Sequence, residues 1–469
     1  SKKYQRKKEK TDKVIILGTF VAFILVLGLL FYSTELYTNH DTVAAVNEDP
    51  KPVSFWVATD LHYLDKGLHD DGQAFQTYVS GGDGKLLPYI DEITEAFVSD
   101  IKQKKPNFII LSGDITNNGE RSSHEELVKK LHRIEKSGTS VYVIPGNHDL
   151  FNPWARAFKD DKQIVIDGIT DKEFTSMYGP YGYDEALSRD KESLSYAVRA
   201  ASGLWLLMID SSQYKNNQKF GFPQTDGRVT PSTLKWIDEC VESATKEHAS
   251  IIAVLHHNLL DHTTMSRAGF KLNNSQETMK NFRKNGINLA LSGHIHMQDI
   301  RKDPDESDKS ADSTLSPVYD IATSAFAVNP HQFGAMTFDP ATRIVNYKTE
   351  PINVEGWAKA NLITDPNLTN FKAYAEKTFG ERSYNKAYSS LKGSKFTEAQ
   401  KKLMAEAMSA LNVRYFAGTA GSRASDLMNT PGYKLWSEVT DGFISGYMQT
   451  MTAPKQPDNI NLQIVLTKR

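Results

Sequence analysis

Short apolar runs alternate with amphipathic stretches from residue 53 to residue 291. The apolar runs have the length of buried strands and are rich in aliphatic and aromatic residues. They are VSFWVAT (53–59), NFIIL (107–111), SVYVI (140–144), LSYAV (194–198), LWLLMID (204–210), SIIAVL (250–255) and INLAL (287–291). Between the first two runs, Ile93, Phe97 and Ile101 recur at helical spacing. Strands that alternate with helices predict an α/β fold.

Two helix starts carry recognisable signals. Ser122 and Glu125 have the spacing of a capping box and predict a helix that continues to residue 136. Pro231, directly after Thr230, favours a helix that runs toward Glu247.

The pattern changes twice toward the C-terminus. Three further strand-like runs follow one another without helices between them, which predicts more than one sheet. They are PVYDIAT (317–323), GAMTFD (334–339) and RIVNYKT (343–349). From about residue 352 the pattern becomes helical, with a capping box at Thr397 and Gln400. Near the end, NINLQIVL (459–466) alternates at first between apolar and polar residues and predicts an edge strand.

The N-terminal residues differ from the rest. Residues 1–13 hold seven Lys/Arg and two Asp/Glu, and residues 14–32 then run for nineteen residues without a charge. Such a run is long enough to span a bilayer, and its basic flank is expected to stay in the cytoplasm. Cleavage as a signal peptide is the alternative, but the site-like Val43–Ala45 lies well beyond the apolar run. We therefore expect an uncleaved single-pass anchor in the cell membrane, with the large C-terminal part extracellular.

Composition narrows the possible functions. The net charge is −2, and without the +5 of residues 1–13 it is −7, which argues against binding long nucleic acid. The chain has one cysteine, Cys240, so a disulfide framework and a cysteine-based zinc site are both excluded. Any metal ligands must therefore be His, Asp, Asn or Glu.

Five of the predicted strands end in residues able to bind a metal ion. These residues are Asp60 and His62, then Asp114, then Asn147, His148 and Asp149, then His256 and His257, and finally His294 and His296. In α/β sheets the strand ends converge on one crevice, so their loops can bring these groups together.

Together these groups offer enough ligands for two ions. Asp60, His62, Asp114, Asn147, one of His256 and His257, His294 and His296 supply seven ligands. Two ions that share a carboxylate can hold both oxygens of an in-line phosphoryl displacement and activate a water molecule. The mixed ligand types suit divalent or trivalent Mn, Fe or Zn, of which we favour Mn or Fe.

The motifs DLH, GDITNNGE, GNHD, LHH and GHIH, in this order, resemble the calcineurin-like metallophosphoesterases, in particular bacterial cyclic-nucleotide phosphodiesterases. The resemblance covers residues 53–350 and implies an αββα sandwich of two sheets. It implies that one ion is held by Asp60, His62, Asp114 and His296, and the other by Asp114, Asn147, His256 and His294. It further implies that His148 faces the substrate, with Asp149 orienting it. The second motif often reads G-D-x-x-D, but here Asn117 takes the last place.

These observations lead to a domain scheme and a function. We expect a cytoplasmic basic segment (1–13), a transmembrane helix (14–32), a linker (33–50), a metallophosphoesterase domain (51–351) and a mainly helical C-terminal domain (352–469). We expect a binuclear phosphodiesterase that hydrolyses a small phosphodiester, by resemblance a cyclic nucleotide. A phosphomonoesterase, an enzyme acting on envelope lipid or cell-wall diesters, and a non-enzymatic membrane-anchored sensor or assembly module are the alternatives. The sequence does not indicate an oligomeric state.

The remaining histidines are not expected to bind metal. His124, His132 and His248 fall on predicted helices, where we expect them to be solvated. His69, His262 and His331 fall in predicted loops.

Overall fold

The computed structural model describes residues 51–263, 269–304, 316–440, 442–453 and 459–469. The chain divides into two units, Ser1–Lys51 and Pro52–Arg469, and the description that follows concerns the second. The predicted basic segment (1–13), transmembrane helix (14–32) and linker (33–50) lie outside the described residues. Within the described ranges, no helix combines the length and the apolar character needed to cross a bilayer.

The first sheet has six strands in the order β15-β14-β13-β1-β2-β3. Its strands are β1 (Val53–Ala58), β2 (Phe108–Ser112), β3 (Ser140–Ile144), β13 (Gln332–Asp339), β14 (Ile344–Pro351) and β15 (Asn461–Val465). β1, β2 and β3 are parallel neighbours, whereas β13, β14 and β15 join antiparallel. The parallel pairing brings the carboxyl ends of the first three strands to one edge.

The second sheet has seven strands in the order β11-β12-β10-β9-β8-β7-β6. Its strands are β6 (Ser188–Arg189), β7 (Tyr196–Ala201), β8 (Leu204–Ile209), β9 (Ser250–Leu255), β10 (Leu289–Ser292), β11 (Asp299–Asp303) and β12 (Val318–Ala322). β8, β9, β10 and β12 run parallel to one another. A separate hairpin pairs β4 (Arg156–Lys159) with β5 (Lys162–Val165).

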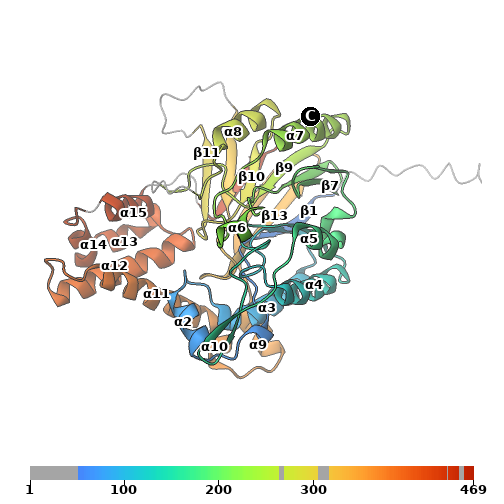
Figure 1. Cartoon of the computed structure of the whole chain (residues 1–469). Helices are drawn as coiled ribbons and strands as arrows, with labels where there is room; N and C mark the ends of the chain where they lie inside the picture. The colour runs from blue at the N-terminus through green and yellow to red at the C-terminus, as the bar shows by residue number, and fades with distance from the viewer. Residues whose placement is uncertain (1–50, 264–268, 305–315, 441, 454–458) are drawn as a thin grey trace, which may run out of the picture. The chain divides into compact units, whose positions relative to one another are not determined.

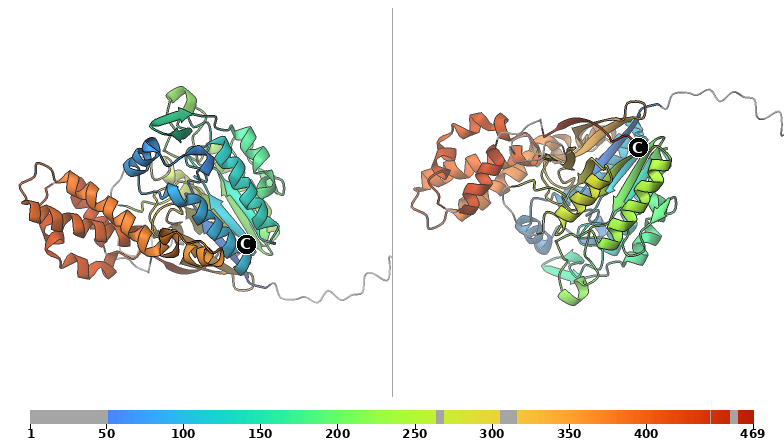
Figure 2. Two further views of the ribbon diagram at one scale, coloured as in Figure 1. Left: turned by 90° about the horizontal axis from the view of Figure 1, so that it is seen from below. Right: turned by 90° about the horizontal axis from the view of Figure 1, so that it is seen from above.

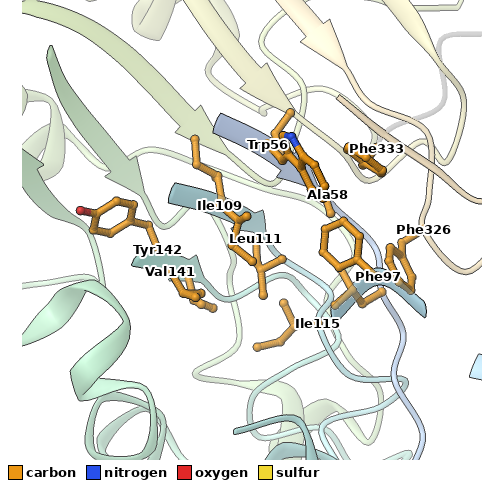
Figure 3. Packing of buried hydrophobic residues seen from close by; sticks show 14 of the residues in the cluster. Trp56, Ala58, Phe97, Ile109, Leu111, Ile115, Val141, Tyr142, Phe326 and Phe333 are labelled. Carbon is orange, nitrogen blue, oxygen red and sulfur yellow. The ribbon is translucent and has the colours of Figure 1, made fainter. Parts of the chain in front are cut away.

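The principal core lies where the two sheets meet and continues under the helices of the first sheet. Phe55 and Val57 of β1 belong to the same buried cluster as Met208 of β8 and Val254 of β9. Trp56 packs against Phe97 of α3 (Ile90–Lys104), with ring centroids 5.8 Å apart (Figure 3). α4 (Arg121–Glu135) adds its apolar side chains to this cluster.

A second core lies between the other sheet and its own helices. Trp205 of β8 clusters with Trp236 and Cys240 of α7 (Pro231–Lys246) and with Phe282 of α8 (Ser275–Lys284). Figure 1 shows α7 and α8 on one side of the sheets and α3 and α4 on the other, and Figure 2 shows the same arrangement from below and above. Shorter elements complete this part: α2 (Gln73–Gly81), α5 (Asp171–Met177), α6 (Asn217–Phe220), the 3-10 turns Lys66–Leu68 and Leu87–Tyr89, and the π-helical turn Gly179–Tyr183.

Helices dominate the chain after β14, and most gather beside the sheets (Figure 1). They are α9 (Val354–Ala360), α10 (Pro366–Thr369), α11 (Phe371–Ser390), α12 (Glu398–Phe416), α13 (Ser425–Met428), α14 (Pro431–Trp436) and α15 (Gly442–Thr452), with a 3-10 turn at Gly421–Ala424. The predicted capping box of Thr397 and Gln400 is present at the start of α12. β15 then returns to the first sheet as its edge strand.

The predicted mixed α/β fold with a helical C-terminal region is confirmed, and the start of α7 at Pro231 is also as predicted. The prediction of a capping box at Ser122 is wrong. α4 begins at Arg121, its N-cap is Glu120, and no side chain caps it. Ser122 therefore lies inside the first turn, where its hydroxyl has no partner among the described residues. The hairpin β4–β5 and the strands β6 and β11 were not predicted, because they are short and their residues do not form apolar runs.

Candidate metal centre

Five strands deliver the predicted ligand residues to one place. Asp60 and His62 follow β1, Asp114 follows β2, and Asn147 follows β3 at the edge of the first sheet. His256 follows β9, and His294 and His296 follow β10, at the edge of the second sheet. Because the parallel strands end side by side, residues that lie more than two hundred positions apart in the chain become neighbours.

The first group consists of Asp60, His62 and His296, whose potential ligand atoms all lie within 4.8 Å of one another. The Nε2 atoms of His62 and His296 are 3.2 Å apart. Asp60 Oδ1 lies 3.4 Å from Nε2 of His296 and 3.7 Å from Nε2 of His62.

The second group consists of Asp114, His256 and His294, again within 4.8 Å of one another. Nε2 of His256 lies 3.1 Å from Oδ2 of Asp114 and 3.1 Å from Oδ1 of Asn147. The same Oδ2 atom of Asp114 is 4.0 Å from Nε2 of His62 in the first group. Asp114 therefore lies where a carboxylate shared between two ions would lie.

The potential ligand atoms are better placed to bind metal ions than to form hydrogen bonds with one another. Asp60 Oδ1 is buried, yet no group in the described part of the chain donates a hydrogen bond to it. Because a buried carboxylate oxygen is costly without a partner, this atom fits a position as a ligand of a cation. Two imidazole nitrogens at 3.2 Å beside it are equally suited to share an ion as ligands.

In two of the histidines, one ring nitrogen contacts a backbone carbonyl oxygen, and this contact fixes the orientation of the ring. Nδ1 of His256 lies 3.0 Å from the carbonyl oxygen of Ser112, and Nε2 of His294 lies 2.7 Å from that of Gly269. Such contacts fix which nitrogen carries the proton and leave the other free for a metal. Nδ1 of His296 faces the carboxylate of Asp83 at 3.6 Å, a partner that the sequence did not suggest.

His257 differs from His256 in its contacts. Its Nδ1 lies 2.8 Å from the hydroxyl of Ser211 and its Nε2 lies 3.1 Å from the carbonyl oxygen of Thr225. Neither partner is a candidate ligand, whereas Nε2 of His256 faces two candidate ligands, Asp114 and Asn147, each at 3.1 Å. Of the two histidines, the geometry therefore favours His256 as the ligand.

The backbone of the centre is strained. Asp60, His62, Asp114, His294 and His296 all have positive φ, between 44° and 70°. This left-handed region costs an L-residue other than glycine roughly 1–2 kcal/mol, so five of the seven predicted ligands are held in an unfavourable conformation. Clusters of such residues are typical of functional sites.

Close packing behind the ligands requires glycine. A Cβ atom on Gly146 would lie 2.2 Å from Oδ1 of Asp114, and one on Gly293 would lie 2.0 Å from Oγ1 of Thr59. Neither position could accept a side chain without moving the loop that carries a ligand.

His148 lies beside the first group, with its ring centroid 5.1 Å from that of His62. Its Nδ1 is 2.9 Å from Oδ1 of Asn118. Asn118 donates its own amide N–H to the hydroxyl of Tyr78 at 3.0 Å, so its oxygen faces His148 as an acceptor. Nδ1 of His148 therefore carries the proton, and burial lowers the pKa of this ring.

The Asp149 carboxylate binds the backbone instead of the His148 ring. It accepts hydrogen bonds from the N–H groups of Gly146 (2.7 Å), Thr116 (2.9 Å) and Ile115 (3.2 Å). Burial raises the pKa of Asp149, and the charge of Asp114 raises it further. Asp149 thus ties the loop after β2 to the loop after β3, while Asn118 orients the His148 ring. The orienting role expected for Asp149 stays a prediction.

Asn118 and Glu120 were missed as supporting residues, although both lie within the quoted GDITNNGE motif. Glu120 is buried and accepts the backbone N–H of Asn118 at 3.0 Å. Burial raises its pKa to about 7. The available signal for these two residues was the cluster of polar residues that follows the predicted strand 107–111.

Two sequence-family profiles match the chain. The profile described as calcineurin-like phosphoesterase matches residues 53–298, just over half of the chain. The profile described as the C-terminal domain of cyclic nucleotide phosphodiesterase matches residues 353–458.

Individual proteins are similar at low identity. A probable cyclic nucleotide phosphodiesterase from Synechococcus sp. is 23% identical over 209 residues, which are 44% of this chain and 64% of that protein. A manganese-dependent ADP-ribose/CDP-alcohol diphosphatase from Xenopus laevis is 25% identical over 186 residues, which are 32% of this chain and 51% of that protein. The chain thus spans between about half and two thirds of the length of these relatives. A solved dimetal phosphatase from Danio rerio overlaps with 64% of this chain and 96% of its own, at 12% identity and a TM-score of 0.44.

Proposed function

Because the chain belongs to the calcineurin-like phosphoesterase family, we propose that it is a metal-dependent phosphodiesterase that hydrolyses nucleotide phosphodiesters, cyclic nucleotides first among them. Membership confirms the predicted family and with it the predicted class of enzyme, a phosphoester hydrolase. The observation that carries the proposal is the meeting of two ligand groups at Asp114, with His148 beside them. The names of the Synechococcus relative and of the C-terminal family support a cyclic nucleotide as the substrate.

The proposed ligands divide between two ions. Asp60, His62, Asp114 and His296 would hold one ion, and Asp114, Asn147, His256 and His294 would hold the other. Ions bound there would supply Lewis-acid polarisation of the phosphoryl group and would acidify a water molecule. The Xenopus relative is named as manganese-dependent, which supports Mn²⁺ as the first ion to test.

His148 is proposed to move a proton during the reaction. Asn118 holds the proton on Nδ1, so any proton that the ring gives or accepts moves at Nε2. Neutral, the ring accepts a proton at Nε2; once protonated there, it can donate a hydrogen bond to a phosphoryl oxygen or give the proton to the leaving oxygen. Asp149 acts at a distance, because it holds together the loops that carry Asp114 and His148.

A panel of phosphoesters tests the proposal. The chain is stripped of metal with a chelator, reloaded with Mn²⁺, and assayed with 2′,3′- and 3′,5′-cyclic nucleotides, ADP-ribose, a glycerophosphodiester and p-nitrophenyl phosphate. We expect Mn²⁺-dependent turnover with the highest kcat/KM for a cyclic nucleotide. Preference for the monoester or for the glycerophosphodiester would overturn the proposal that the substrate is a nucleotide. Absence of turnover with two bound ions would favour a non-enzymatic sensor or assembly module.

The location of the enzyme is also a proposal. The basic residues 1–13 and the uncharged residues 14–32 support a membrane anchor with an extracellular catalytic part. Protease accessibility in intact cells tests this location, because a cytoplasmic catalytic part would be protected from added protease.

A further inference from the structure

A pocket of about 390 Å³ opens beside His148. Its lining includes Tyr78, Asp83, Lys85, Asn118, His148, Trp154 and Lys386. Its volume lies at the lower end of the range for small-molecule sites, roughly 300–1,000 Å³. Because His148 lines the pocket and lies beside His62, a ligand in this pocket would lie next to the candidate metal centre.

The lining of the pocket includes an ion pair between Lys85 and Asp83. The side chain of Lys85 is only 11% exposed, and its ammonium lies 3.5 Å from the carboxylate of Asp83. Lys85 and Lys386 share the lining with His148, so both cations are available to the phosphate of an anionic ligand there.

The lining of the pocket also includes an exposed aromatic ring. Trp154 is 46% exposed, and no hydrogen bond to its indole N–H and no ring contact is recorded in the part of the chain that the structure describes. Its backbone is nevertheless fixed: the N–H of Trp154 binds Oδ1 of Asn152 at 2.9 Å, and Nδ2 of Asn152 binds the carbonyl oxygen of His148 at 2.9 Å. The backbone that carries the ring is therefore tied to the loop of His148, and the exposed ring is available for stacking.

The helical C-terminal region holds the opposite wall of the pocket. Arg382 of α11 donates to the carbonyl oxygen of Val79, and Nζ of Lys386 donates to that of Gly82 at 3.1 Å. Gly84, with φ of 106°, lies against the ring of Phe379, which a Cβ atom on the glycine would approach to 3.1 Å. α11 thus supports the segment that carries Lys85 and adds Lys386 to the lining.

We propose that this pocket binds the nucleoside part of a nucleotide, with Trp154 stacked against the base, Lys85 beside the phosphate, and Lys386 of α11 at the rim. The inference rests on the proposed function and deepens it, because it says which residues select a nucleotide over other phosphodiesters. Aromatic side chains bind bases of any sequence by stacking, and a nearby cation serves the phosphate. The helical region is then part of the substrate site.

Two substrates separate base recognition from chemistry. The Mn²⁺-loaded full chain is assayed with 2′,3′-cyclic AMP and with the abasic ribose 2′,3′-cyclic phosphate. Trp154→Ala should lower kcat/KM for cyclic AMP by on the order of 10- to 100-fold, the range expected for one base–aromatic stack, and change kcat/KM for the abasic substrate less than about twofold. Trp154→Phe should retain more of the activity toward cyclic AMP, because it keeps an aromatic face.

A matched control is available on the surface. Phe222 is 49% exposed and does not line the pocket, so Phe222→Ala should leave the ratio of the two substrates unchanged. Metal content and melting temperature, measured on every variant, exclude a loss of fold as the cause. An equal effect of Trp154→Ala on both substrates, or no effect on either, would overturn the inference.

Lys85 provides an independent measurement. Lys85→Met should raise KM for the cyclic nucleotide and the abasic substrate alike, since both carry the phosphate, whereas Lys85→Arg should restore part of the binding. Normal KM values for Lys85→Met would refute its role. If the wild-type enzyme hydrolyses no nucleotide, the proposed function itself fails; if it hydrolyses nucleotides but these variants behave as controls, only the pocket assignment fails.

Discussion

Replacing His262 by alanine should destabilise the protein by about 3–5 kcal/mol, because it leaves two buried carboxylates without a shared cation. Nδ1 of His262 lies 2.9 Å from Oδ2 of Asp299, and its Nε2 lies 3.0 Å from Oδ2 of Asp320. All three side chains are buried. Nε of Arg301 also binds Asp299, at 2.7 Å, but Asp320 has no such second cation in the described structure.

The magnitude follows from the contacts that are lost. Each charge-assisted hydrogen bond contributes about 1.5–3 kcal/mol, so two of them account for most of the expected loss. If the roughly 420 residues of Pro52–Arg469 unfold in one step, their unfolding entropy is about 0.9 kcal/mol/K. The melting temperature should then fall by roughly 3–6 °C.

The effect should depend on pH. Burial lowers the pKa of His262, but the charges and hydrogen bonds of Asp320 and Asp299 outweigh it, so the net pKa is raised above 6.5. A raised pKa in the folded state means that the stabilisation is complete below pH 6.5 and is lost as pH rises through the folded-state pKa. The difference in melting temperature between wild type and His262→Ala should therefore be larger at pH 6 than at pH 9.

The assay is thermal unfolding in excess Mn²⁺, so that the metal centre stays loaded. His132→Ala is the matched control, because His132 is an exposed histidine on α4, and it should change the melting temperature by less than about 1 °C. A His262→Ala protein that melts with the wild type at pH 6 would refute the reasoning. The same variant should also bind metal less well, because Asp320 holds the backbone N–H groups of Leu259 and Leu260 just beyond His256.

Three further predictions concern the catalytic part. Asp114→Ala should lose both ions and melt at a lower temperature, because the free energy of metal binding also stabilises the fold; elemental analysis showing two retained ions would contradict its shared position. His148→Ala should keep both ions and the wild-type melting temperature while kcat falls by about 10²–10⁴, and a normal kcat or a loss of metal would remove its catalytic assignment. A chain that begins at Asp49 should be soluble and fully active with Mn²⁺, and a folded but inactive product would show that residues 1–48 contribute to the reaction.

The positions of the candidate ligands could be predicted from the sequence because each follows a local signal. Asp60 and His62, for example, come directly after the apolar run 53–59. The carboxyl ends of parallel strands converge, and this convergence brings the candidate ligands together. The partners that orient the ligands could not be found in this way. Asp83 faces His296 across more than two hundred residues, and nothing in its own neighbourhood indicates that contact.

The other histidines show the same limit. His124 was expected to be solvated, but it is buried, with Nδ1 2.8 Å from the hydroxyl of Tyr178. Its position three residues before Leu127 and seven before Leu131, both buried on α4, places it on the apolar face, so helical periodicity alone could have predicted its burial. His262 lies in a loop without periodicity, and only the folded structure reveals the two carboxylates that surround it.

The left-handed backbone at the candidate ligands constrains how the sequence can drift. Five such residues together cost about 5–10 kcal/mol, an amount comparable to the whole stability of a typical domain. Substitution of any one of them by glycine would remove a ligand and relieve strain in the same step. In a lineage that no longer needed the enzyme, selection for stability alone would favour these substitutions, so the metal centre would be erased before the sheets that hold it.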